Sequence, residues 1–249
     1  MTEPKKARPA ATVILLRRAE PRGFELFLTR RPDDMPFLGG VYCFPGGTVR
    51  NEDHSPSMLR RCHGLLPNDA RKIAGAHFAP AEALGLWVAA IRELFEEVGV
   101  LLAVNENGEG QKARHFDTTE LGKRHAALLE KSLSFRSFLE SEKLLCDLSR
   151  LAYFSYWRTP SESSVRFDTR FFLAMLPDDQ SPMLTSPEVA HGLWLTPDRA
   201  LELFANNELP MIFPTFASLR TLADFDTLES LFREYRFGSS RTGVLEYSR

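Results

Sequence analysis

At 249 residues, 43 % of them apolar, the chain can bury a sizeable core as one large domain or two small ones, and its formal net charge of -2 argues against a dedicated nucleic-acid binder. No apolar run reaches the roughly 18 residues of a membrane-spanning helix, and the polar first residues do not resemble a signal peptide. Three widely spaced cysteines argue against a disulfide framework, so we expect a cytoplasmic protein without nucleic-acid or membrane partners.

Strand patterns open the chain and a helical pattern follows. Apolar, β-prone residues predict strands at 11–18 and 23–31. The next segment, "FLGGVYCFPGG", has four glycines and a proline, and predicts a tight turn at Gly46–Gly47. The polar stretch 54–80 shows weak periodicity, whereas 81–98 has the apolar spacing of a helix.

The second half of the chain continues the alternation of strands and helices. A loop is predicted over 105–118, and one or two helices over 119–151. Further segments predict strands at 166–176 and 190–196 and helices at 197–207 and 225–236. We therefore expect one mixed α/β domain over residues 10–238, with an insertion at about 54–80 and a helical insertion at about 105–150.

Three carboxylates crowd one face of the predicted helix at 81–98. Glu93, Glu96 and Glu97 follow a spacing of three and four residues, which places them within roughly a 100° arc opposite the apolar face. Like charges so spaced destabilise an exposed helix by about 0.2–0.5 kcal/mol per pair. Because carboxylate oxygens also suit Mg²⁺ and Mn²⁺, two interpretations stay open for this helix alone, a solvated acidic face or a hard-cation site.

The surroundings of this helix resemble the signature of the nudix hydrolases. "RELFEEVGV", Arg92–Val100, matches the second half of that signature at every specified position, and Gly46–Gly47 match its glycine turn. Two features depart from the signature. Asp53 stands where the family has Glu, and 44 residues rather than 13 separate Gly47 from Arg92. The resemblance implies the nudix fold, an α/β/α sandwich with a mixed β-sheet.

The same resemblance implies a role for each matching position. A backbone carbonyl and the helix carboxylates would bind Mg²⁺ or Mn²⁺ and activate a water molecule for attack on a diphosphate. The residues assigned to the metal are Gly46, Glu93, Glu96 and Glu97. Arg92 would orient a glutamate through an ion pair, with Asp53 as a candidate partner. Nudix enzymes often add an acidic residue from later in the chain, for which Glu188 is the candidate and an ordinary solvated loop residue the alternative.

Longer segments resemble the nudix subgroup that contains the mammalian peroxisomal coenzyme A diphosphatase, whose signature is also interrupted. The likeness runs from about Ala11 to "LWLTPDRAL" and includes Thr29 and Arg31 of a coenzyme A motif, whose next arginine falls at Met35. It implies cleavage of coenzyme A or acyl-coenzyme A to 3′,5′-ADP and 4′-phosphopantetheine or its acylated form. ADP-ribose, a nucleotide sugar or a dinucleotide are alternative substrates, and a binding module without activity is the alternative class.

Arginines are the expected contacts of the substrate phosphates, because guanidinium groups match phosphate oxygens. The candidates are Arg30, Arg31, Arg166 and Arg170. For each of them a surface or structural ion pair is the alternative, and Asp168 is a candidate partner within the predicted strand at 166–176. A homodimer is expected from the habit of the family alone.

Overall fold

The computed structural model describes residues 6–19, 23–110, 118–163 and 165–237. Its centre is a seven-stranded mixed sheet, in which one pair of neighbours is parallel and the others are antiparallel. In sheet order the five main strands are β10 (His191–Leu195), β2 (Phe24–Arg30), β1 (Arg8–Arg18), β9 (Phe167–Met175) and β8 (Leu151–Arg158). Two short strands complete the sheet, β3 (Tyr42–Cys43) beside β2 and β4 (Gly46–Thr48) beside β1.

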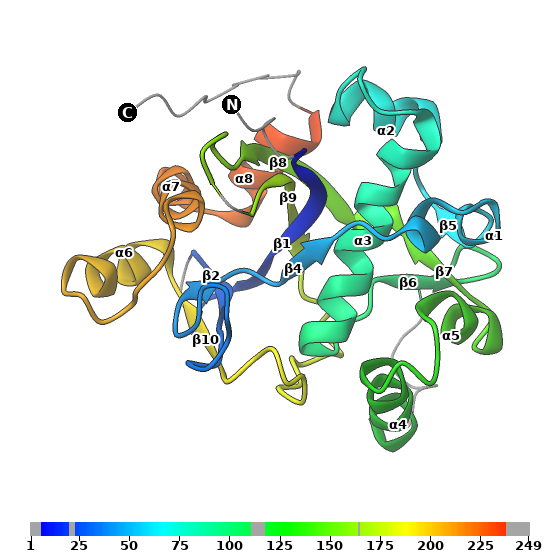
Figure 1. Ribbon diagram of the computed structural model, residues 1–249, viewed down its shortest axis with the longest axis horizontal. Helices are drawn as coiled ribbons and strands as arrows, with labels where there is room; N and C mark the ends of the chain where they lie inside the picture. Colours follow the sequence, from blue (N-terminus) through cyan, green and yellow to red (C-terminus); the bar gives the residue numbers. More distant parts are fainter. Residues whose placement is uncertain (1–5, 20–22, 111–117, 164, 238–249) are drawn as a thin grey trace.

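Helices cover both faces of this sheet (Figure 1). One face carries α3 (Pro80–Val98), and the helices of the other face are α6 (Pro197–Ala205), α7 (Phe213–Leu222) and α8 (Leu228–Phe237). Alternate residues of β1 divide between the two layers. Val13 and Leu15 belong to the core with α3, and Ile14 and Leu16 to the core with α6, α7 and α8. The predicted α/β/α sandwich with a mixed sheet is confirmed.

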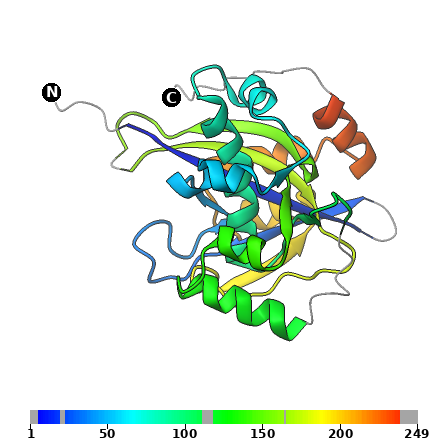
Figure 2. The ribbon, with the colours of Figure 1, turned by 90° about the vertical axis from the view of Figure 1, so that its right-hand side faces the viewer.

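A second, three-stranded sheet joins the two regions in which insertions were predicted. Its strands in sheet order are β5 (Cys62–His63), β7 (Leu144–Asp147) and β6 (Ala103–Asn105). The helices of these regions are α1 (Pro56–Leu59), α2 (Pro67–Ala74), α4 (Thr118–Leu129) and α5 (Phe135–Ser141). Figure 2 shows α2 near the start of α3 and α4 near its end, so the two regions flank that helix. The extent of the single domain, 10–238, stays a prediction.

Some elements differ from those predicted. The helical prediction over 119–151 is wrong beyond Glu142, because "LLCD" forms β7 and pairs with β5 and β6. Strand β8 and helix α7 were not predicted, although both bury apolar residues in the sandwich. The predicted loop at 105–118 turns back at Gly108, and its residues 111–117 lie outside the described residues. Within the described ranges, no helix is long and apolar enough to cross a membrane.

Candidate active site

The three carboxylates lie on α3, a helix that is buried along most of its length. Pro80 begins the helix, and Gly99 ends it in the left-handed conformation (φ 68°) that glycine adopts readily. Fifteen of its nineteen residues are buried, because the helix packs against β1 and β4 of the sheet and also against α2 and the short helix η1 (Asn51–His54). Glu93 and Glu97 are only 8 % and 6 % exposed. A solvated acidic face, one of the two interpretations left open, is therefore excluded.

The glycine pair Gly46–Gly47 brings a backbone strand against this helix. The predicted tight turn is wrong here: both residues lie in β4, paired with β1, and neither has a positive φ. A Cβ on Gly46 would lie 2.5 Å from the carbonyl oxygen of Ala11, and a Cβ on Gly47 would lie 2.6 Å from the carboxylate of Glu93. Real Cβ atoms do not approach so closely, so a side chain at Gly46 would clash with the backbone of β1, and one at Gly47 would displace the Glu93 carboxylate. Both glycines therefore allow a close contact and do not form a turn.

Arg92 is held by a two-oxygen ion pair with Asp53, the residue that replaces the family glutamate. Nε and Nη2 of Arg92 lie 2.8 Å from Oδ1 and Oδ2 of Asp53, and both side chains are 3 % exposed. Nη2 also donates to the carbonyl oxygen of Thr48 at 3.0 Å. Burial disfavours the charged guanidinium, but Asp53 and Glu93 outweigh it and raise the pKa of Arg92, which stays charged. The predicted partnership of Arg92 with Asp53 is thus present despite the long interruption.

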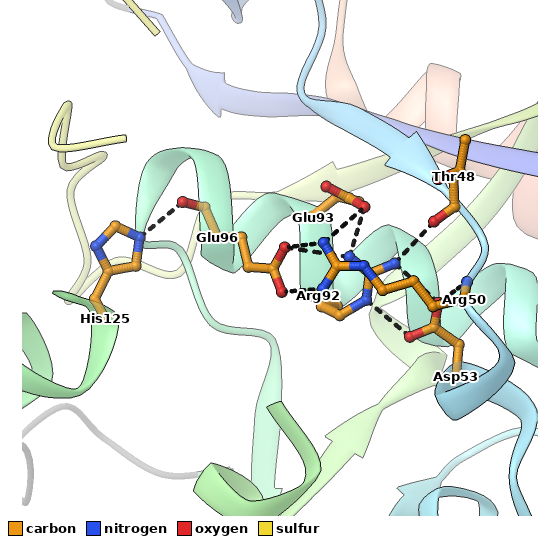
Figure 3. A network of polar contacts seen from close by, with 7 residues as sticks. All are labelled: Thr48, Arg50, Asp53, Arg92, Glu93, Glu96 and His125. Atoms are coloured by element: carbon orange, nitrogen blue, oxygen red, sulfur yellow. Dashed lines mark hydrogen bonds and ion pairs between the residues drawn. The ribbon is translucent and has the colours of Figure 1, made fainter. Parts of the chain in front are cut away.

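Two arginines share the carboxylates of Glu93 and Glu96 (Figure 3). Nη1 of Arg92 donates to Glu93 Oε1 at 2.5 Å and to Glu96 Oε2 at 3.2 Å. Arg50, on the loop between β4 and η1, donates to both oxygens of Glu96, at 2.8 and 2.7 Å. Arg50 was not among the predicted site residues, because it occupies an unspecified position of the signature. Its signal in the sequence is a basic residue three places after Gly47.

Glu97 is the carboxylate with the least compensation. Burial raises the pKa of Glu97 well above its ordinary value, and the negative charges of Glu93 and Glu188 raise it further. A hydrogen bond from the backbone of Gly46 and the positive charge of Arg31 oppose this rise. Burial also raises the pKa of Glu93, which Arg92 opposes. Gly46, Arg31 and the exposed loop residue Glu188 are therefore near enough to Glu97 to act on its charge.

We expect the metal-free protein to lose stability as the pH rises above about 4.3, the usual pKa of glutamate. A carboxyl group whose pKa is higher in the folded protein than in the unfolded chain contributes stability at low pH. This contribution is fully present below the unfolded-state pKa and is lost as the pH rises through the folded-state pKa. Urea unfolding of chelator-treated protein between pH 4 and pH 8 measures this change. Other groups titrate in the same range, so Glu97→Gln is the reference. The free energy of unfolding of wild type should fall relative to the variant as the pH rises, and parallel curves would contradict the assignment.

All four predicted arginines have contacts within the fold. Arg31 donates from Nε to the carbonyl oxygen of Phe37 at 3.2 Å. Arg30 pairs with Asp33 at 2.6 Å. Arg166 donates to the carbonyl oxygen of Thr159 in the β8–β9 hairpin at 3.4 Å.

Arg170 is buried between β9 and the end of α2, at 2 % exposure. It pairs with Asp168, the expected strand partner, and donates to the carbonyl oxygen of Ala74 at 3.0 Å. Its guanidinium also lies 3.9 Å from the ring centroid of Tyr156. This arrangement anchors α2 to the sheet. Substrate binding by Arg170, and likewise by Arg30 and Arg166, stays a prediction.

His125 is a buried residue of α4 that was not predicted to support the site. Its Nε2 lies 2.9 Å from the carbonyl oxygen of Glu96, which accepts only, so this nitrogen carries the proton. Its Nδ1 lies 3.0 Å from the hydroxyl of Thr185, in the loop that leads to Glu188. The ring therefore satisfies a carbonyl at the end of α3 and ties that end to the loop.

We expect His125→Ala to lower the free energy of unfolding by about 1–3 kcal/mol, because it leaves a buried carbonyl without its donor. His125→Gln can still donate from its side-chain amide and should keep much of that stability. Urea denaturation of the three proteins tests this. Equal losses in both variants would show that the hydrogen bond to Glu96 contributes little.

The oxygen atoms around Glu97 are of the chemical kind that binds a hard divalent cation. Glu93 and Glu97 are nearly buried, and among the described side chains no Lys, Arg or His forms a salt bridge with Glu97. A buried carboxylate that is destabilised by the negative charges of Glu93 and Glu188 needs either a proton or a cation. Oxygen ligands of this kind suit Mg²⁺ or Mn²⁺. As the side chains stand, the described part of the chain holds no group of three or more His, Cys, Asp or Glu arranged to bind a metal.

Comparisons of the sequence and of the fold with known proteins point to one family. A family model described as the NUDT19 Nudix domain matches residues 7–222. The acyl-coenzyme A diphosphatase NUDT19 of Gallus gallus is 29 % identical, over 94 % of this chain and 72 % of the chicken protein. The Xenopus laevis protein of the same name is 26 % identical, over 84 % of this chain and 62 % of its own. The crystal structure of a nudix hydrolase from Alicyclobacillus acidocaldarius is 29 % identical and superposes with a TM-score of 0.76, covering 91 % of this chain and 95 % of that one.

Proposed function

Because the chain belongs to the NUDT19 Nudix domain family and is a nudix hydrolase, we propose that it hydrolyses the diphosphate of coenzyme A or acyl-coenzyme A. The observation that carries the catalytic part is the buried, cation-poor carboxylate of Glu97 beside Glu93 and Gly46. The substrate part is supported by the chicken, frog and human relatives, which are named acyl-coenzyme A diphosphatases and are 26–29 % identical to this chain. Nudix hydrolases generally use divalent metal ions, and we propose Mg²⁺ or Mn²⁺ here.

The reaction is a substitution by water at phosphorus. An oxygen of water bonds to one phosphorus of the diphosphate while the bridging P–O bond breaks. Coenzyme A then gives 3′,5′-ADP and 4′-phosphopantetheine, and an acyl group stays on the second product. A divalent ion bound here would lower the pKa of the attacking water and offset the charge of the phosphates.

The side chains of the site are proposed to have different roles in this reaction. Glu93, Glu96, Glu97 and the carbonyl of Gly46 are the proposed ligands of the metal. Arg92, fixed by Asp53, keeps the Glu93 carboxylate in place.

Two further residues are proposed to contact the reactants. Glu188 is exposed on its loop and acts electrostatically on Glu97, which makes it our candidate to accept the proton of the water. Arg31, whose charge also acts on Glu97, is the arginine best placed to bind a substrate phosphate.

A product-resolved substrate panel tests the proposal. Purified protein with Mg²⁺ or Mn²⁺ is incubated separately with coenzyme A, acetyl-coenzyme A, ADP-ribose, a nucleotide sugar and a dinucleotide, and products are separated by chromatography. We expect 3′,5′-ADP from the two coenzyme A species. Turnover of ADP-ribose without 3′,5′-ADP from coenzyme A would reject the substrate, and tight binding without any turnover would favour a binding module.

Two further expectations belong with this proposal. We propose a cytoplasmic location, which agrees with three cysteines that are all free. A homodimer stays a prediction from the family, and size-exclusion chromatography with light scattering would test it.

A further inference from the structure

We propose that Arg50 competes with the divalent cation for the carboxylate of Glu96. Because Arg50 must release Glu96 before the metal can bind it, we call Arg50 the latch. The inference rests on the proposed metal site of α3 and adds a positioning residue to it. It concerns the step before catalysis, in which Glu96 becomes available as a ligand.

The contact between Arg50 and Glu96 occupies both carboxylate oxygens of Glu96, which are the atoms that would bind a metal. The two guanidinium nitrogens Nη1 and Nη2 of Arg50 lie 2.8 and 2.7 Å from Oε1 and Oε2 of Glu96. Figure 3 shows both side chains and their contacts. A two-oxygen pair of this kind is the strongest arrangement of arginine and carboxylate. The Glu96 side chain is 13 % exposed, so water competes little for it. While the pair persists, neither oxygen of Glu96 faces a metal freely.

The two arginines that contact Glu96 differ in their freedom to move. Arg92 is 3 % exposed and fixed by Asp53, whereas the Arg50 side chain is 51 % exposed on a loop. Arg50 can therefore turn into solvent by giving up its pair with Glu96 and a longer contact of 3.9 Å to Glu93 Oε1. Release of Arg92 would instead leave the buried carboxylate of Asp53 unpaired. The latch is thus the arginine whose release disturbs the fold least.

The arrangement of the carboxylates agrees with a closed latch. Glu96 turns toward Arg50 and Arg92, whereas Glu97 has no salt bridge with any described side chain. This division explains why three acidic residues of one helix are not gathered as a ligand group within the described residues. Opening the Arg50 contact frees Oε1 of Glu96, the oxygen for which Arg50 is the donor, while Arg92 keeps its contact with Oε2.

Manganese affinity measured without substrate tests the latch. Isothermal titration with MnCl₂ compares wild type, Arg50→Ala, Arg50→Lys and the control Arg199→Ala. Arg199 forms a similarly exposed pair with Glu202 on α6, at 52 % exposure. We expect Arg50→Ala to bind Mn²⁺ about fivefold more tightly, as loss of a partly exposed ion pair allows. Arg50→Lys should also bind more tightly than wild type, because lysine cannot hold both oxygens. Arg199→Ala should match wild type.

Several results would overturn the latch. Unchanged or weaker binding by Arg50→Ala would mean that Arg50 positions Glu96 for the metal instead of withholding it. Wild-type affinity in Arg50→Lys, with tighter binding in Arg50→Ala, would assign the effect to charge alone. Absence of Mn²⁺ binding in all four proteins would remove the metal site and the latch together. The coenzyme A assay is separate, since a latched enzyme that hydrolyses another diphosphate would leave this inference standing.

Discussion

Replacement of Glu97 by glutamine should reduce kcat for coenzyme A hydrolysis by about a thousandfold or more. A carboxylate ligand that holds the catalytic ion contributes several kcal/mol of transition-state stabilisation, and each 1.36 kcal/mol changes the rate about tenfold. The amide of glutamine has nearly the same shape but no negative charge. Initial rates of 3′,5′-ADP release in saturating Mg²⁺ or Mn²⁺ measure the effect.

The same substitution should leave the metal-free fold as stable as wild type, or more stable. Glu97 is buried, and Glu93 and Glu188 disfavour its charged form, so a neutral side chain removes repulsion. Glu202→Gln, at an exposed position of α6, is the control and should change neither quantity. Wild-type turnover in Glu97→Gln would reject the ligand assignment. Lost turnover with a large loss of stability would instead indicate a structural role.

Replacement of Arg92 by alanine should lower the free energy of unfolding by about 3–5 kcal/mol, because it leaves the buried carboxylate of Asp53 without its partner. Turnover should fall as well, since Glu93 loses the donor that orients it. Urea unfolding at pH 7 measures the stability. Arg199→Ala, which breaks only an exposed pair, should stay within about 0.5 kcal/mol of wild type.

A double-mutant cycle separates this pairing from simple loss of side-chain volume. If Asp53 is the main partner, Arg92→Ala combined with Asp53→Ala should lose about 1–3 kcal/mol less than the sum of the single variants. The unpaired charge that penalises each single variant is absent from the double variant. Additive losses would show that Arg92 depends on its other acceptors, Thr48, Glu93 and Glu96, rather than on Asp53.

The parts of the fold that follow from local pattern could be predicted from the sequence. The apolar spacing of α3, with Pro80 at its start and Gly99 at its end, specifies that helix locally. β1, β2 and β9 are apolar runs with enough β-prone residues to be predicted as strands from the sequence.

Elements that depend on distant partners were harder to predict. Strand β7 has four residues and exists through its pairing with β5 and β6. The glycine pair is a strand for a similar reason, since its conformation is set by β1 on one side and the Glu93 carboxylate on the other.

The site divides in the same way. Arg92, Glu93 and Glu97 could be predicted because a fixed spacing places them on one helix. Asp53 could be predicted because it stands at the position of the signature glutamate, six residues after Gly47. Arg50 and His125 carry no such spacing: they come from a loop and from α4, and only the tertiary fold brings them to Glu96. Burial of the carboxylates was equally hidden, because a helix wheel shows which residues share a face but not what covers it.

The location of manganese in soaked crystals tests the role of the α3 carboxylates most directly. Anomalous scattering identifies the ion independently of any assumption about its ligands. We expect a peak within bonding distance of carboxylate oxygens of Glu97 and at least one of Glu93 and Glu96, beside the backbone of Gly46. A fully occupied manganese elsewhere, with those carboxylates still turned to arginine and to each other, would contradict the metal site on which the proposed hydrolysis depends.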